Sequence, residues 1–145
     1  MNDFFTPSFF DIVTIISAGT ALIVSLSTSK KSSSSESYSD LDHLYMDVLK
    51  IGMEHPEFRD PEKTKNYKQS FKDKEQLMAY ETYAYIVWNV CETVYDRTKN
   101  DKTNRKTWYP IIEAEKKLHL SWLLNEENHH KFKSGFREFC NSKQL

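Results

Sequence analysis

Glu115 and His119 are the residues whose types and spacing come closest to a chemical site. They lie four residues apart in a stretch with helical periodicity, so both side chains can face the same way, and Trp122 follows about one turn later. A carboxylate beside an imidazole could bind a metal ion or transfer protons. Two ligands from one helix do not complete a metal site, however, because such sites use three or four protein ligands. No spacing rule selects the remaining ligands among Cys91, Glu92, His129 and His130.

The rest of the sequence favours a structural role for this group. The chain has no glycine-rich phosphate loop, no Cys-x-x-Cys, no His-Glu-x-x-His and no Gly-x-Ser-x-Gly motif, and it contains only three glycines. We therefore expect no cofactor, no metal ion and no catalytic residue, with His119 as a hydrogen-bonded core residue. The alternative is a metal- or ligand-binding enzyme or sensor centred on Glu115 and His119.

A second group combines aromatic and acidic side chains on one side of a predicted helix. Its members recur at helical spacing and are Glu81, Tyr85, Trp88, Glu92 and Asp96. One interpretation is that the rings lie at the edge of a hydrophobic core. The other is a recognition strip for a partner protein or a small cation, in which Tyr85, Trp88 and Glu92 would make the contacts.

The elements that must position these residues are predicted to be helices. Apolar residues at three-to-four spacing indicate helices over residues 40–53 and 70–99, a third beginning near 107–110, and a fourth after 125–128. Asp60 before Pro61 predicts a short capped helix to about residue 67. Cys91 and Cys140 fall on apolar faces and are expected to be core residues. Gly135, between two phenylalanines, predicts close approach of another helix.

Between the second and third of these helices lies a polar segment, residues 96–107, with more basic than acidic side chains. We expect a solvated loop there, with contact to anionic lipid headgroups as the alternative. The net charge of the whole chain is −1, which does not suggest a nucleic-acid partner.

The N-terminal part of the chain has a different character. Residues 9–26 are apolar apart from Asp11, and a helix of this length spans roughly 27 Å, close to the hydrocarbon thickness of a bilayer. We interpret residues 1–29 as a transmembrane anchor, residues 30–39 as a serine-rich tether and residues 40–145 as a helical bundle domain. A cleaved signal peptide is disfavoured because no lysine or arginine precedes the apolar run. A buried helix of a soluble domain is disfavoured because nothing downstream could cover it on all sides.

The flanks and faces of this segment predict its orientation and a contact. Lys30 and Lys31 follow the apolar run, so the positive-inside rule places the N-terminus outside and the C-terminal domain in the cytoplasm. Small residues recur on one side of the predicted span, where helices in a membrane can approach closely. That side consists of Thr14, Ser17, Ala18, Ala21 and Ser25. We expect it to pack against another membrane protein or a second copy of the chain.

Two segments stand out beside the helical pattern, MEHPEFRD at 53–60 and YAYIVWNVCETVYDR at 83–97, together with a set of spaced single residues. These are Trp108, Pro110, Glu115, His119, Trp122, Phe132, Phe136 and Phe139. Taken together, they resemble a family of uncharacterised bacterial proteins with one N-terminal transmembrane helix and a small all-helical cytoplasmic domain. The resemblance implies the same architecture and assigns no activity to any residue.

The sequence as a whole predicts an all-α protein: a single transmembrane helix, a serine-rich tether and a bundle of about four helices. Its expected function is that of a non-enzymatic, membrane-anchored interaction module, such as a small accessory subunit of a larger membrane complex. Expected partners are the lipid bilayer and another membrane protein or a second copy of the chain, and not nucleic acid.

Overall fold

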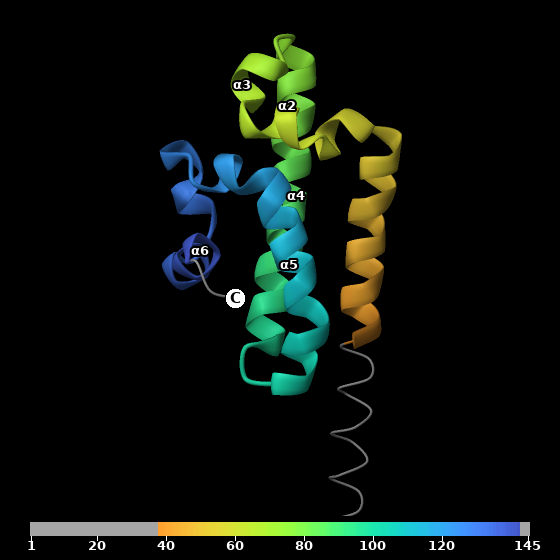
Figure 1. Cartoon of the computed structure of the whole chain (residues 1–145), viewed down its shortest axis with the longest axis vertical. Coiled ribbons are helices and arrows are strands. Elements are labelled where there is room, and N and C mark those ends of the chain that lie inside the picture. The colour runs from red at the N-terminus through yellow and green to blue at the C-terminus, as the bar shows by residue number, and fades with distance from the viewer. Residues whose placement is uncertain (1–37, 143–145) are drawn as a thin grey trace, which may run out of the picture. The chain divides into compact units, whose positions relative to one another are not determined.

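The computed structural model describes residues 38–142, and within this range the chain folds into helices and turns with no strand (Figure 1). The all-helical prediction for the domain is confirmed. The predicted span and its small-residue side, with Thr14, Ser17, Ala21 and Ser25, lie outside the described residues. Among the residues that the structure describes, no helix is long and apolar enough to cross a membrane. The residues from Leu41 onward form one compact unit.

The first described helix covers residues 38–54 and buries Leu41 and Val48. The chain then turns through η1, Pro56–Arg59, into two short helices, α2, Pro61–Lys65, and α3, Tyr67–Ser70. The carboxylate of Asp60 accepts a hydrogen bond from the backbone N–H of Glu62, and Pro61 occupies the first helical position. The predicted cap at this turn is therefore confirmed.

Two long helices, α4, Lys74–Thr98, and α5, Lys102–Leu123, pack against each other and form the centre of the unit. α4 begins later than predicted because Asp73 caps it, by accepting from the N–H of Glu75. α5 begins earlier than predicted, because Asp101 accepts from the N–H groups of Thr103 and Asn104. Most of the expected loop at residues 96–107 is thus helical, and Pro110 lies inside α5 rather than in its first turn.

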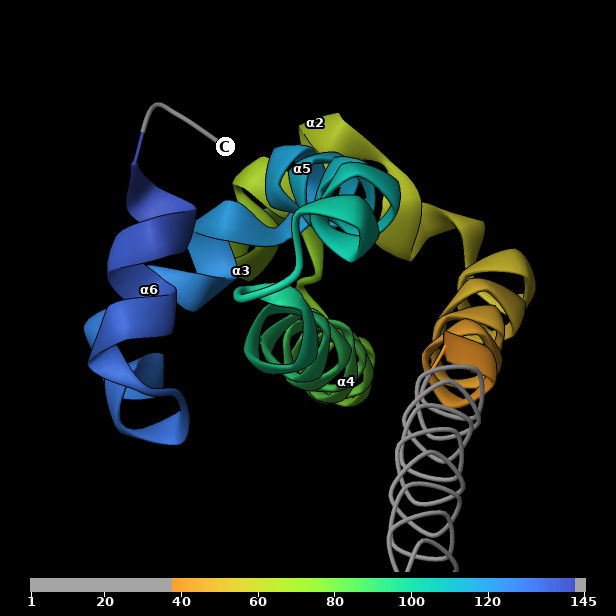
Figure 2. The ribbon, with the colours of Figure 1, turned by 90° about the horizontal axis from the view of Figure 1, so that it is seen from below.

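The C-terminal part consists of η2, Glu126–Lys131, and α6, Ser134–Asn141. Figures 1 and 2 show that α6 and the first described helix lie on opposite sides of the α4–α5 pair. Phe136 and Cys140 of α6 are buried. The prediction for Gly135 was wrong, because a Cβ atom there would meet nothing within 4 Å. Gly135 lies in the first turn of α6 and is exposed, whereas Phe132 and Phe136 pack against Trp122 and Trp88.

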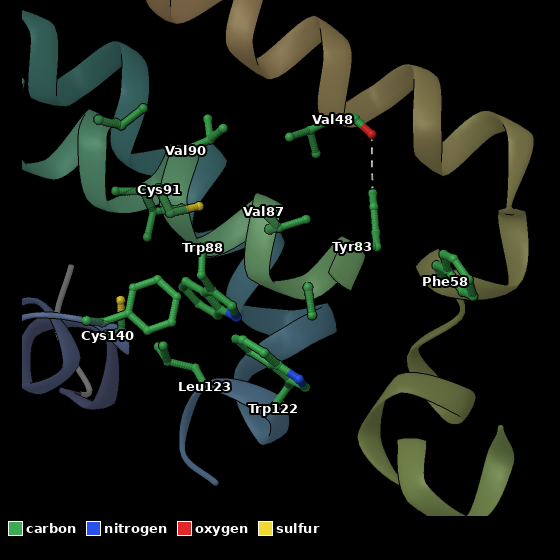
Figure 3. Packing of buried hydrophobic residues seen from close by; sticks show 14 of the residues in the cluster. Val48, Phe58, Tyr83, Val87, Trp88, Val90, Cys91, Trp122, Leu123 and Cys140 are labelled. Atoms are coloured by element: carbon green, nitrogen blue, oxygen red, sulfur yellow. Dashed lines mark hydrogen bonds between the residues drawn. The ribbon is translucent and has the colours of Figure 1, made fainter. Parts of the chain in front are cut away.

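The core is continuous from the first described helix to α6 and is rich in aromatic rings (Figure 3). Trp88 and Trp122 have 0% and 1% of their surfaces exposed. Cys91 and Cys140 are buried, free thiols, which confirms their prediction as core residues. Burial raises the pKa of the Cys91 thiol well above its usual value and that of Cys140 to about 12, so both remain protonated and unreactive.

Candidate functional site

Glu115 lies in the middle of α5 with its side chain completely buried. An isolated buried carboxylate would be strongly destabilising, so its charge has to be balanced within the fold. Arg59, from η1, supplies that balance through two hydrogen bonds. Its Nη2 donates to Oε1 of Glu115 at 2.9 Å, and its Nη1 donates to Oε2 at 3.2 Å. This is the paired, fork-like geometry in which arginine binds a carboxylate most strongly.

Two tyrosines extend the ion pair to the neighbouring helices. The hydroxyl of Tyr45, on the first described helix, donates to Oε1 of Glu115 at 2.9 Å. The hydroxyl of Tyr83, on α4, accepts from Nη1 of Arg59 at 3.0 Å and donates to the backbone carbonyl of Val48 at 3.4 Å (Figure 3). Burial, together with the charge of Glu115 and the bond to it, raises the pKa of Tyr45, which therefore stays a neutral donor.

The path of the Arg59 side chain depends on a glycine in the first described helix. A Cβ atom at Gly52 would lie 2.5 Å from Cδ of Arg59 and 2.8 Å from the hydroxyl oxygen of Tyr83. The absence of a side chain at Gly52 thus lets Arg59 pass over the helix and reach Glu115. Burial disfavours the charged form of Arg59, but the bonds to Glu115 and its negative charge outweigh this and raise the pKa of the guanidinium.

His119 is completely buried one turn beyond Glu115. Its Nδ1 lies 3.2 Å from the hydroxyl of Tyr80, and its Nε2 lies 3.6 Å from Oε2 of Glu115. The nearby carboxylate would favour an imidazolium, but Arg59 already balances that charge. Burial first, and then the positive charge of Arg59, lower the pKa of His119 to about 3, so the ring is neutral. With the proton on Nε2, the ring accepts from Tyr80 and points its N–H towards Glu115.

We call this group the buried polar network. Its members come from the first described helix, η1, α4 and α5, and they are Tyr45, Arg59, Tyr80, Tyr83, Glu115 and His119. The aromatic rings of Phe58, Tyr67 and Phe71 surround Tyr80 at centroid distances of 5.7, 5.4 and 4.7 Å. Arg59 retains partial exposure, with 24% of its side chain accessible, whereas Glu115 and His119 have none. A substrate would therefore reach neither of the two groups that could transfer a proton.

The predicted Glu115, His119 and Trp122 set is brought together only in part. Glu115 and His119 face each other, while Trp122 packs against Tyr85 and Phe132. Among the described residues, no group of three or more His, Cys, Asp or Glu side chains is arranged to hold a metal ion. The predicted core role of His119 agrees with its burial and its contact with Tyr80.

The comparisons add no family to this picture. The chain matches no protein-family model, and neither curated proteins nor solved structures show a significant match to it.

The members of the aromatic and acidic row on α4 have three different environments. Trp88 is buried, and its Nε1–H donates to the backbone carbonyl of His119 at 3.1 Å. Glu92 accepts from the backbone N–H of Lys133 at 2.9 Å, and Asp96 pairs with the ammonium group of the same lysine. The acidic end of the row thus holds the start of α6, whereas Tyr85 is 42% exposed.

Sequence reasoning missed Arg59 and Tyr45 as partners of Glu115. It also missed Tyr83 as a partner of Arg59 and Tyr80 as a partner of His119. A signal was present, because Glu115 falls on the apolar face of its helix and an acid in that position needs a basic partner. The helical pattern alone could not choose that partner among 20 lysines and arginines, since η1 is irregular and joins α5 only through the tertiary fold.

Proposed function

We propose that this protein is a non-enzymatic, membrane-anchored helical interaction module that serves as an accessory subunit of a membrane protein complex. One observation carries the proposal: the groups capable of chemistry face inward, while flexible apolar side chains face outward. Glu115 and His119 are enclosed in the core, whereas Met78 on α4 is 61% exposed. Exposed methionines are common on binding surfaces because the unbranched side chain adapts to different partners.

The outward side of α4 offers a surface for such a partner. Two shallow grooves meet along it and share Met78 and Thr82. One groove is lined on its far side by Ile51 of the first described helix and by His55, the N-cap residue of η1. The other is lined by Tyr85 and by Lys131 from η2. We call this surface the α4 surface. Its apolar floor with a polar rim is typical of protein–protein contacts.

The rival function, an enzyme or sensor centred on Glu115 and His119, requires a ligand to displace Arg59 and Tyr45 from the carboxylate. Both bonds to Oε1 are 2.9 Å long and lie beneath the first described helix and η1. Removing Arg59 would leave a buried charge without compensation, and removing Tyr45 would cost Oε1 one of its hydrogen bonds. The enclosed geometry therefore supports the interaction module over this alternative.

The test is co-purification of tagged full-length protein from its native membranes in mild detergent. Met78→Glu places a charge in the α4 surface and should remove the partner. The matched control is Met53→Glu, since Met53 is 81% exposed but does not line either groove. Retention of the same partner by Met78→Glu would contradict the role of the α4 surface.

A second variant examines the predicted membrane span. Replacing Ser17 and Ala21 together with leucine keeps the segment apolar while blocking close approach of another helix. If the partner binds through the span, the double variant should lose it while Met78→Glu retains it. A stoichiometric metal ion that is removed by His119→Ala would overturn the proposal in favour of the rival function.

A further inference from the structure

α5 carries a concentration of positive charge on its exposed side, from its first residue to Lys117. Lys102, Lys106 and Lys117 are exposed, Arg105 is half-buried, and all four line one hollow along the helix. We call these four residues the α5 basic surface. Among the described residues that line this hollow, Glu113 is the one acidic side chain. Its Oε1 lies 3.5 Å from Nζ of Lys116.

The acidic side chains closest in sequence are already engaged elsewhere. Asp96 pairs with Lys99 and Lys133, and these bonds lower the pKa of its carboxyl group. Asp101 caps α5 by accepting from two backbone N–H groups and from the side-chain amide of Asn104. The positive charge of the α5 basic surface is therefore only partly compensated by its neighbours.

The position of this surface in the fold indicates what it meets. In Figure 1 the N-terminal end of the first described helix and the α4–α5 turn lie at the same end of the unit. The chain thus enters the domain on the side where the α5 basic surface begins. The sequence predicts a serine-rich tether before the first described helix, which would keep the domain close to the predicted anchor.

We propose that the α5 basic surface docks against anionic lipid headgroups of the bilayer that holds the anchor. This inference rests on the proposed membrane anchorage and goes beyond it, because a tether alone leaves the domain free to reorient. Each lysine or arginine near an anionic leaflet favours the docked state by roughly fivefold. Three such residues would shift the docked-to-undocked ratio by roughly a hundredfold. Asp42 is exposed on the first described helix, so α5 and not that helix should face the lipid.

Docking can be measured on the full chain in vesicles by energy transfer to a headgroup-labelled lipid. The two native thiols are 1% and 0% exposed, so a maleimide dye will label an introduced surface cysteine selectively. Ala114→Cys places the dye in the hollow. Gln76→Cys places it in the first turn of α4, and the start of this helix lies at the end of the unit opposite the α4–α5 turn (Figure 1). We expect energy transfer from position 114 to rise more than that from position 76 when phosphatidylserine is added to phosphatidylcholine vesicles.

Two charge variants and a measurement at high salt show whether the energy transfer depends on the α5 basic surface. The variant with Lys102, Lys106 and Lys117 changed to glutamine should lose the phosphatidylserine-dependent rise. A control with Lys65, Lys72 and Lys74 changed to glutamine, which removes the same charge elsewhere, should keep it. The rise should also disappear in 1 M salt, where the screening length falls to roughly 3 Å.

Three outcomes would overturn the inference: equal transfer in neutral and anionic vesicles, a rise that survives the α5 substitutions, or loss of the rise in the control variant. Tight, salt-dependent binding of a single-stranded RNA that requires Lys102 and Lys106, without a lipid response, would also overturn it. Failure of the full chain to incorporate into pure phosphatidylcholine vesicles would instead contradict the anchorage. Flotation with phosphatidylserine vesicles would then show whether the α5 basic surface binds lipid by itself.

Discussion

Replacing Glu115 with glutamine tests whether the buried polar network is a structural clamp. Glutamine keeps the shape of the side chain but removes the charge opposite Arg59 and brings an N–H₂ group towards the guanidinium donors. Three hydrogen bonds depend on the carboxylate, two from Arg59 and one from Tyr45. Breaking a buried ion pair on one side costs about 3–5 kcal/mol. Because 24% of the Arg59 side chain is exposed, water can solvate part of the guanidinium, and we expect a cost of about 3 kcal/mol.

Such a loss is large compared with the total stability of a domain, which is about 5–15 kcal/mol. At about 4 °C for each kcal/mol, the melting temperature should fall by roughly 12 °C. Tryptophan fluorescence is a suitable assay, because the three tryptophans of the chain, Trp88, Trp108 and Trp122, are all buried in the helical unit. Their emission will therefore report on this unit even when the full chain is held in detergent.

Two comparisons make the result interpretable. Asp47→Asn breaks an ion pair with Lys50 whose side chains are 68% and 67% exposed, and it should leave the melting temperature unchanged. Arg59→Met combined with Glu115→Leu removes both charges, and the double variant should be more stable than the sum of the single changes predicts. A Glu115→Gln protein as stable as the wild type would refute the reasoning, because it would mean that the carboxylate is not needed by the fold.

Two further predictions concern His119 and the glycines. Because the pKa of His119 is about 3 in the folded protein and 6.5 ordinarily, only the unfolded chain binds this proton between those values. Its contribution to stability is therefore complete above pH 6.5 and is lost as the pH falls towards 3, by about 1.4 kcal/mol per unit. Urea titrations at pH 7.5 and 5.5 should show a smaller decrease in His119→Gln than in the wild type; equal decreases would contradict this. Gly52→Ala should destabilise the protein by about 1–3 kcal/mol through its clash with Arg59, although alanine normally favours a helix. Gly135→Ala is the matched control and should be neutral or stabilising, and a Gly52→Ala protein that melts no lower than Gly135→Ala would show that Arg59 can take another path.

Local patterns in the sequence were enough to predict much of the helical fold. The first described helix covers residues 38–54 against a predicted 40–53, and Asp60 with Pro61 caps α2 as expected. These features depend on residues within one or two turns of each other, so the sequence contains the information directly. The starts of α4 and α5 were misplaced because the apolar pattern does not locate the capping residue. Asp73 caps α4 three residues after its predicted start, and Asp101 caps α5 well before Pro110.

The long-range partners could not be predicted in this way. Arg59 reaches Glu115 only because Gly52 leaves room for its side chain and because η1 turns the chain back towards α5. Gly52 and Gly135 also illustrate the limit. Gly52 makes the close contact that the sequence suggested for Gly135, since the contact depends on an arginine from another segment rather than on a neighbouring helix.

The buried polar network also links the stability of the fold to the proposed interaction. The groove on the far side of Met78 is lined by Ile51 of the first described helix, by His55, the N-cap residue of η1, and by Phe58 of η1. Tyr45 and Arg59, which lie on these same two segments, hold them against Glu115. The hydrogen bonds from Tyr45 and Arg59 to Glu115 form only when both segments are in one position relative to α5. Apolar contacts alone would let the segments shift along α5. Glu115→Gln should therefore weaken both folding and partner capture, although Glu115 itself is inaccessible. Met78→Glu should weaken partner capture alone, and this difference separates a residue that shapes the α4 surface from one that contacts the partner.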